Sequence, residues 1–210
     1  MSTAKRIAVL VSGGGTNLQA LIDAQNRGEI VNGEIALVVS SSPTAYALER
    51  AAKAGIPTIV VNKADYPDRH VMTRALVSEL QERAIDLVVF AGFMYILTEE
   101  ITLAFQNRMM NVHPALIPSF CGEGYYGLHV HEKALEYGVK LSGATVHFVS
   151  EECDGGPIIL QKAVPVEEGD TPETLQRRIM EQAEWVILPQ AVSLFCQDRL
   201  RVEGRLVHIS

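Results

Sequence analysis

The chain has 210 residues, of which 48% are hydrophobic and 20% are charged, and its formal net charge is −7. A chain of this length fits one domain with a substantial core, and its composition is ordinary for a soluble protein. The acidic balance argues against nucleic-acid partners, because no basic stripe is present to neutralise phosphates.

The first half of the sequence alternates short apolar, β-branched runs with segments whose apolar residues have helical spacing. The runs predict five strands, and the segments between them predict four helices. This alternation is typical of an α/β protein with a mostly parallel, doubly wound sheet. The predicted strands are 7–11, 35–39, 58–61, 87–90 and 109–112, and the predicted helices are 17–25, 45–54, 69–83 and 99–105.

The pattern changes after residue 113. A segment rich in glycine and aromatic residues, 119–128, predicts an exposed loop. The elements after it predict an antiparallel carboxyl-terminal part, with Pro189 bending or interrupting its long helix. No domain boundary is visible, so we expect residues 1–210 to form a single domain with a Rossmann-like sheet. The later predicted elements are a helix at 131–137, strands at 144–149 and 158–164, a long helix at 171–195, and a strand or hairpin around Gly204 at 202–209.

The sequence also indicates a location. No apolar run is long enough to span a membrane, and the six amino-terminal residues are too polar for the apolar region of a secretory signal. Cys121, Cys153 and Cys196 lack the spacing of a zinc site or a disulfide framework. We therefore expect a cytoplasmic protein without membrane partners.

A glycine-rich turn, residues 12–17, follows the first predicted strand and opens the first predicted helix. Glycines allow close backbone approach, and a helix start offers unpaired amides, so phosphate binding is expected. A P-loop needs a lysine that is absent here, and a dinucleotide site needs a glycine where Leu18 stands and an acid where residues 40–42 are serines. A single phosphate fits better, and the alternative is a tight turn capped by Thr16 or Asn17.

Asn111 and His113 stand at the end of the fifth predicted strand, where Pro114 removes the next backbone amide. Alternate residues of a strand share a face, so a carboxamide and an imidazole are expected side by side, which suits stabilisation of an oxyanion. Asp154, in an Asp-Gly-Gly-Pro sequence, is expected to contact His113 and raise its pKa, so that the imidazole stays protonated near neutral pH. Taken alone, the pattern also fits an ordinary strand end.

Residues 91–97 leave the carboxyl end of the fourth predicted strand as a glycine followed by an apolar run. That edge of an open α/β sheet borders ligand crevices, so the run fits a pocket for a flat ring. Core packing is the alternative interpretation.

Together these features resemble one enzyme family. Residues 12–20, 91–94, 111–114 and 154–157 occur in the order found in the phosphoribosylglycinamide formyltransferases, over about residues 5–200. The resemblance implies transfer of the formyl group of 10-formyltetrahydrofolate to the amine of phosphoribosylglycinamide in purine biosynthesis. It implies small-molecule partners, no metal, no covalent enzyme intermediate, and a monomer or homodimer.

The resemblance also implies roles for individual residues. Two positions depart from the family pattern: Tyr95 stands where a polar residue is common, and Trp185 replaces a common histidine. The implied catalytic residues are Asn111, His113 and Asp154; the implied substrate-binding residues are Gly15, Thr16, Asn17 and Glu184; and the implied folate-binding residues are Arg69, Met94, Tyr95, Ile96, Leu97, Asn111, Ser150, Glu151, Glu152, Cys153 and Asp154.

Other histidines and cysteines have weaker signals. His147 is expected either to support the catalytic residues or to be a satisfied core histidine. His129 and His131 lack a third ligand at sensible spacing, so a metal site is not expected. No base lies beside a cysteine in the arrangement that covalent catalysis requires.

Four alternative functions remain at this stage. A formyltetrahydrofolate hydrolase would use water in place of the amine, but that family usually carries an additional amino-terminal domain. A methionyl-tRNA formyltransferase would need a carboxyl-terminal domain and a basic RNA surface. A regulatory module would have lost catalysis, which the intact Asn111, His113 and Asp154 argue against. A nicotinamide-dependent oxidoreductase is a poor match, because Leu18 stands where its dinucleotide-binding sequence needs a glycine.

Overall fold

Seven strands form one sheet in the order β3-β2-β1-β4-β5-β6-β7 in the computed structural model, which describes residues 4–210. The first five strands pair in parallel, whereas β6 pairs antiparallel with both β5 and β7. The prediction of a mostly parallel sheet with an antiparallel carboxyl-terminal part is confirmed. The strands are β1 (Lys5–Val11), β2 (Gly33–Ser40), β3 (Thr58–Val60), β4 (Leu87–Phe90), β5 (Met109–His113), β6 (Leu141–Phe148) and β7 (Ile158–Pro165).

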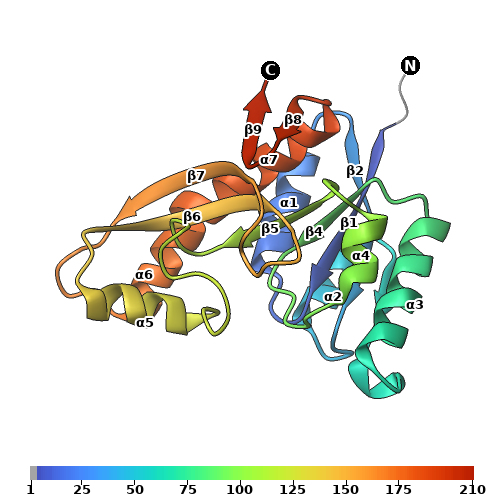
Figure 1. The fold of residues 1–210 in the computed structure, drawn as a ribbon, viewed down its shortest axis with the longest axis horizontal. Coiled ribbons are helices and arrows are strands. Elements are labelled where there is room, and N and C mark those ends of the chain that lie inside the picture. The colour runs from blue at the N-terminus through green and yellow to red at the C-terminus, as the bar shows by residue number, and fades with distance from the viewer. Residues whose placement is uncertain (1–3) are drawn as a thin grey trace.

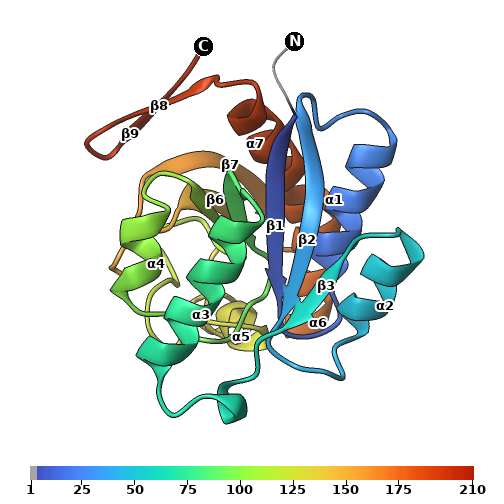
Figure 2. The same ribbon diagram turned by 90° about the vertical axis from the view of Figure 1, so that its right-hand side faces the viewer.

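Helices cover both faces of this sheet (Figures 1 and 2). Apolar residues of α3 and α4 pack on one face, and those of the other helices pack on the opposite face. A separate hairpin of β8 (Leu200–Glu203) and β9 (Leu206–Ile209) turns at Gly204, as predicted. The helices are α1 (Thr16–Asn26), α2 (Tyr46–Lys53), α3 (Arg69–Glu82), α4 (Glu99–Ala104), α5 (Leu128–Tyr137), α6 (Pro172–Ile179) and α7 (Trp185–Cys196).

Strand β1 shows why the sheet has two covered faces. Ile7 and Val9 belong to the core cluster on one side, and Ala8 and Leu10 belong to the cluster on the other side. Alternate residues of a strand point to opposite faces, so a continuous apolar run requires helices on both.

The long helix predicted over 171–195 is irregular, but not at the predicted residue. A π-helical turn, Met180–Glu184, separates α6 from α7, and Pro189 lies inside α7. A proline ring clashes with the carbonyl one turn earlier, so the distortion arises on its amino-terminal side. The predicted long helix is therefore interrupted, but the interruption lies at Met180–Glu184 and not at Pro189.

Three loops meet at one edge of the sheet because parallel strands end at the same edge. The glycine turn follows β1, residues 91–97 follow β4, and β5 ends at His113. Strands β2 and β4 flank β1 on opposite sides, so the chain direction across the sheet reverses beside β1. Ligand crevices in open α/β sheets form at such reversal points.

The described residues contain no helix with the length and apolar character needed to cross a membrane. Residues 1–3, half of the amino-terminal segment interpreted above as too polar for a secretory signal, lie outside the described part of the chain.

Candidate active site

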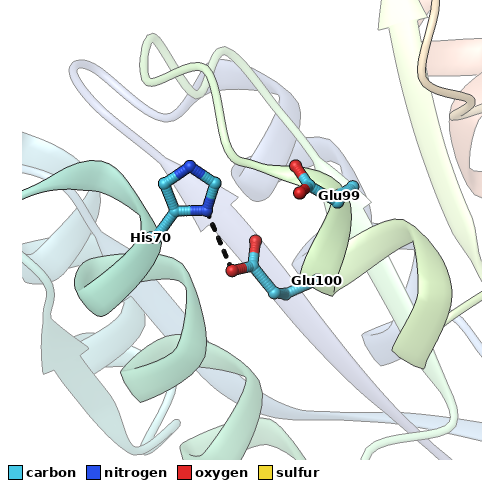
Figure 3. A group of neighbouring side chains, drawn as sticks. All are labelled: His70, Glu99 and Glu100. Atoms are coloured by element: carbon cyan, nitrogen blue, oxygen red, sulfur yellow. Dashed lines mark hydrogen bonds and ion pairs between the residues drawn. The ribbon is translucent and has the colours of Figure 1, made fainter.

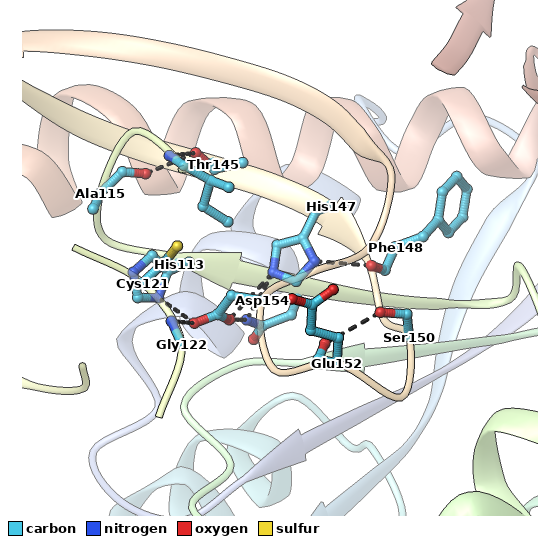
Figure 4. A network of polar contacts seen from close by, with 12 residues as sticks. His113, Ala115, Cys121, Gly122, Thr145, His147, Phe148, Ser150, Glu152 and Asp154 are labelled. Atoms are coloured by element: carbon cyan, nitrogen blue, oxygen red, sulfur yellow. Dashed lines mark hydrogen bonds and ion pairs between the residues drawn. The ribbon is translucent and has the colours of Figure 1, made fainter. Parts of the chain in front are cut away.

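Asp154 lies between His113 of β5 and His147 of β6 (Figure 4), and Asn111 of β5 also contacts its carboxylate. Its Oδ2 is 3.4 Å from Nδ1 of His113, and its Oδ1 is 3.5 Å from Nε2 of His147. The Nδ2 of Asn111 donates to the same Oδ1 at 3.4 Å. The structure thus brings together the three residues predicted to be catalytic, and their catalytic roles stay a prediction.

The backbone of Asp154 and the amide of Gly122 hold its carboxylate in this position. Asp154 adopts a φ of 54°, and the backbone amide of Gly122 donates to its Oδ2 at 3.0 Å. Gly156 then passes so close to β6 that an added Cβ would lie 1.7 Å from the carbonyl oxygen of Phe148. The Asp-Gly-Gly sequence is therefore required by a tight return of the chain as well as by the chemistry of its acid.

Burial decides the pKa of His113. Its side chain is only 5% exposed, and this burial lowers the pKa below the ordinary histidine value, although the charge on Asp154 and the carbonyl of Phe120 raise it. The expectation that Asp154 keeps the imidazole protonated near neutral pH is wrong for this arrangement. Desolvation of the cation outweighs its attraction to the carboxylate.

Asp154 itself stays ionised. Burial raises the pKa of its carboxyl, but the hydrogen bond to His147, the charge on His113 and the amide of Gly122 together lower the pKa below the usual value. A buried carboxylate with these partners can stabilise a positive charge on either neighbouring imidazole.

His147 belongs to this group of residues. Its Nδ1 contacts the carbonyl oxygen of Phe148 at 2.8 Å, and its Nε2 lies 3.3 Å from Nδ2 of Asn111. The ring is buried and both nitrogens have partners. The two interpretations left open for His147 are therefore compatible, because the satisfied core histidine also orients Asn111 and Asp154.

The glycine-aromatic loop, 119–128, is exposed at residues 119, 123, 124, 126 and 127 and half-buried at the others. At its base, the carbonyl oxygen of Phe120 lies 2.8 Å from Nε2 of His113, and Gly122 contacts Asp154 as described. The Phe120 side chain packs against the core. Both ring nitrogens of His113 therefore face acceptors.

The glycine turn is built against α2. Gly15 has a φ of 70°, and an added Cβ would lie 2.6 Å from Cβ of Ala47. The amide of Ala47 donates to the Gly13 carbonyl at 3.1 Å, and Nε of Arg50 donates to the Gly14 carbonyl at 2.8 Å. These contacts turn carbonyl oxygens toward α2 and leave amides at the start of α1, an arrangement suited to an anion.

The expected alternative of a side-chain cap on α1 is wrong. The residue that caps the helix is Gly15, and no side chain caps it. Thr16 contacts the sulfur of Met180 through Oγ1 at 3.9 Å, and Nδ2 of Asn17 donates to Oε2 of Glu184 at 2.7 Å. Both side chains point toward the π-helical turn instead of back over the helix start.

Glu184 is a second buried acid, beside Asn17 of α1. It ends the π-helical turn at 6% exposure, and burial raises its pKa to about 7, with the Asn17 hydrogen bond lowering it in part. The carboxyl can therefore change its protonation state near neutral pH. Trp185, one of the two departures, buries its Nε1 without a partner among the described residues.

Residues 91–97 are joined to the glycine turn. Oγ of Ser12 accepts from the amide of Met94 at 2.8 Å and from Oγ of Ser41 at 2.6 Å. The hydroxyl of Tyr95 donates to the Ser41 carbonyl at 3.0 Å. Met94 and Ile96 are 54% and 70% exposed, so this segment offers apolar surface beside the glycine turn.

The remaining predicted folate residues lie on two separate segments. Arg69 and Lys63 line a hollow of about 380 Å³, and the ammonium of Lys63 is 5.8 Å from the ring centroid of Tyr95. The loop before Asp154 is mostly exposed, with Oγ of Ser150 donating to the Glu152 carbonyl at 3.2 Å. The segment consists of Ser150, Glu151, Glu152 and Cys153.

His70, Glu99 and Glu100 bring possible metal ligands within 4.8 Å of one another (Figure 3). However, Oε1 of Glu100 already accepts from His70 at 2.9 Å and from Arg74 at 3.1 Å. Hydrogen bonds from Thr98 and His70 lower the pKa of Glu100 to about 2. These contacts join α3 to α4. Arg74 already binds the Glu100 carboxylate that a metal cation would need as a ligand.

His129 and His131 do not share a site. His129 is exposed and lies 3.2 Å from Glu132, whereas His131 is buried and burial lowers its pKa to about 4. Residues two apart on a helix point in different directions.

The sequence analysis placed Ser12 in the glycine turn without predicting its contacts, and it missed Ser41 and Arg50, which contact that turn. The serines after β2 were used only to exclude a dinucleotide site, although their position at the strand end is itself a signal. Arg50 has no local motif, because its contact with Gly14 depends on how α2 packs.

A family model described as formyl transferase matches residues 5–192. The chain is 42% identical over 205 residues to a phosphoribosylglycinamide formyltransferase of Haemophilus influenzae, covering 98% of this chain and 93% of that protein. It is 44% identical to the trifunctional purine biosynthetic protein adenosine-3 of Drosophila pseudoobscura pseudoobscura, covering 94% of this chain but only 14% of that protein. A crystal structure of glycinamide ribonucleotide transformylase 1 from Symbiobacterium toebii matches with a TM-score of 0.93 at 47% identity, covering 100% of this chain and 95% of that one.

Gly15→Ala should lower the free energy of unfolding by about 1 to 3 kcal/mol, because it combines a positive φ with a clash against Ala47. Urea unfolding measures the change. Gly13→Ala is the matched control, since an added Cβ there meets nothing within 4 Å. Equal stability of the two variants would contradict the close packing of the turn on α2.

Glu184→Gln should remove a pH dependence of stability. An acid whose folded-state pKa is raised to about 7 binds protons more tightly when folded, so the wild type loses stability as pH rises from about 4.5 to about 7. The full effect corresponds to about 3 kcal/mol. Between pH 4.5 and 8, the free energy of unfolding of the variant, measured in urea, should therefore rise relative to that of the wild type. A difference between the two proteins that does not change with pH would rule out a raised pKa.

Proposed function

The chain belongs to the formyl transferase family, and on that premise we propose that it transfers the formyl group of 10-formyltetrahydrofolate to the amine of 5'-phosphoribosylglycinamide in purine biosynthesis. The products are formylglycinamide ribonucleotide and tetrahydrofolate. The observation that carries the proposal is the contact of Asp154 with His113 and Asn111, at the sheet edge shared by the glycine turn. The names of the similar proteins support the choice of substrates.

The proposed reaction begins when the free amine attacks the formyl carbon. A carbon–nitrogen bond forms, and negative charge develops on the former carbonyl oxygen. Asn111 can donate to this oxygen through its amide, and His113 can donate through a ring nitrogen once the ring has taken the proton of the attacking amine. The bond from carbon to the folate nitrogen then breaks, so no covalent enzyme intermediate is needed.

Proton transfer is the proposed task of His113 and Asp154. Because burial lowers the pKa of His113, the neutral ring can accept a proton from the attacking amine. The carboxylate of Asp154 stabilises the imidazolium that forms, and the ring then passes the proton to the leaving folate nitrogen. His147 keeps Asn111 and Asp154 oriented during these steps.

Donation from Nε2 of His113 to the oxyanion has a structural requirement. That nitrogen faces the carbonyl oxygen of Phe120 at 2.8 Å. The Phe120 carbonyl therefore has to turn away from this nitrogen when the formyl group enters, while the Gly122 amide stays on Asp154.

The substrate phosphate is proposed to bind at the start of α1, through Gly15, Thr16 and Asn17, with the guanidinium of Arg50 nearby. Glu184 would face the amine side of the same substrate. The folate is proposed to lie along the apolar surface joined to Ser12, and to reach the loop before Asp154. The proposed folate contacts are Arg69, Met94, Tyr95, Ile96, Leu97, Asn111, Ser150, Glu151, Glu152, Cys153 and Asp154.

The cellular setting is part of the same proposal. The partners would be the two small-molecule substrates, and the protein would act in the cytoplasm. Its chain would form a single domain and would act as a monomer or homodimer. The chemistry described requires no metal ion, because Asn111 and His113 supply the oxyanion donors. The hydrolase remains the main alternative, since water in place of the amine would use the same three residues.

His113→Ala and Asp154→Asn should each reduce turnover by about a hundredfold to a thousandfold, while binding of both substrates changes little. Steady-state kinetics and direct binding measurements separate the two quantities. His129→Ala is the matched control, because this exposed histidine contacts Glu132 and the ring of Tyr125 and none of the three predicted catalytic residues. Turnover near the wild-type value in both active-site variants would remove the proposed roles.

The reaction itself is tested by supplying 5'-phosphoribosylglycinamide and 10-formyltetrahydrofolate and following the release of tetrahydrofolate. Release that depends on the amine is the expected result. Release without the amine would favour a hydrolase, and the absence of release would favour a binding module; either would contradict the proposal.

A further inference from the structure

Three residues form a row across the antiparallel part of the sheet. His113 of β5 pairs with Thr145 of β6, and Thr145 pairs in turn with Gln161 of β7. Directly opposed residues of adjacent strands point to the same face. The side chains of Thr145 and Gln161 therefore lie on the face that carries His113, next to the segment that leaves β5.

Thr145 binds that segment at two points. It is fully buried, and its hydroxyl donates to the Ala115 carbonyl at 2.7 Å (Figure 4). The same oxygen accepts from the amide of Ile117 at 3.1 Å. The backbone two and four residues after His113 is thus attached to β6.

Gln161 completes the attachment from the next strand. Its Nε2 donates to the Ile117 carbonyl at 2.9 Å and to the Thr145 hydroxyl at 3.0 Å. Both polar groups of Ile117 are therefore bound, one by Thr145 and one by Gln161. Such a connected network holds a loop more firmly than separate contacts do, because each bond orients the next.

This segment connects His113 to the turn that contacts it. Only two residues separate Ile117 from Phe120, whose carbonyl faces His113, and Gly122 then donates to Asp154. A shift of Ile117 would therefore move both the Phe120 carbonyl, which contacts His113, and the Gly122 amide, which binds Asp154.

We propose that Gln161, acting with Thr145, is a positioning residue for formyl transfer: it anchors Ile117 and thereby holds the turn that brings the Gly122 amide to the carboxylate of Asp154. This inference rests on the proposed function. Gln161 is an exposed residue, and the contacts that it makes through Nε2 are to Ile117 and Thr145 and to none of the predicted substrate-binding residues.

The main test is Gln161→Glu, which keeps the shape of the side chain and removes the donor. A small misplacement of a catalytic group can cost about a hundredfold in rate, so we expect kcat to fall by about tenfold to a hundredfold. The KM values for both substrates and the thermal unfolding temperature should stay unchanged. An unchanged kcat, or a raised KM with kcat retained, would overturn the proposal.

Two comparisons separate positioning from a general structural effect. Lys162→Gln changes the next residue of β7, whose side chain points to the opposite face, and should leave kcat unchanged. Thr145→Ser keeps the hydroxyl and should retain more turnover than Thr145→Val, which loses it. Equal turnover in the two Thr145 variants would contradict a role for the hydroxyl network.

Hydrogen exchange of the Gly122 amide tests the same geometry without any substrate. Gln161→Glu should accelerate this exchange at least about tenfold, because the amide is held on Asp154 only while the turn stays in register. Accelerated exchange in a protein without transferase activity would support the anchor while the proposed function fails. Unchanged exchange would overturn the anchor whatever the activity.

Discussion

The structure of the site depends on one buried carboxylate. A charged group removed from water is tolerated only when hydrogen bonds or opposite charges replace its hydration. Asp154 meets this requirement with the Gly122 amide, the Asn111 amide and two imidazoles, which come from three different parts of the chain. The need to satisfy this one group therefore fixes the relative positions of β5, β6 and the loop over them.

The parallel sheet supplies the second half of the geometry. Strands β1, β4 and β5 end at the same edge, so the glycine turn, the apolar 91–97 segment and His113 become neighbours although they are distant in sequence. Ser12 joins the first two directly by accepting a hydrogen bond from Met94. An anion at the start of α1 and an apolar ring along the 91–97 segment would thus flank one reactive centre, as a transfer between two bound substrates requires.

The sequence patterns correctly predicted the features that depend only on residues close together in the chain. Strand periodicity and Pro114 located His113 at the end of β5, and the βα alternation gave the sheet. The pKa direction of His113 could not be predicted, because it depends on how far Phe120 and the core bury the ring. The contacts of Gln161 with Ile117 likewise depend on pairing between strands far apart in sequence. Pro189 correctly marked an irregular helix, but the irregularity is the π-helical turn at Met180–Glu184, which the sequence did not predict.

The central claim is that the carboxylate of Asp154 acts electrostatically on His113. Its most direct test is an NMR titration of the His113 ring in the wild type and in Asp154→Asn. The account predicts a wild-type pKa below the ordinary histidine value of about 6.5, and a still lower pKa in the variant, because burial remains while the stabilising charge is lost. A His113 pKa that is unchanged or raised in Asp154→Asn would contradict it.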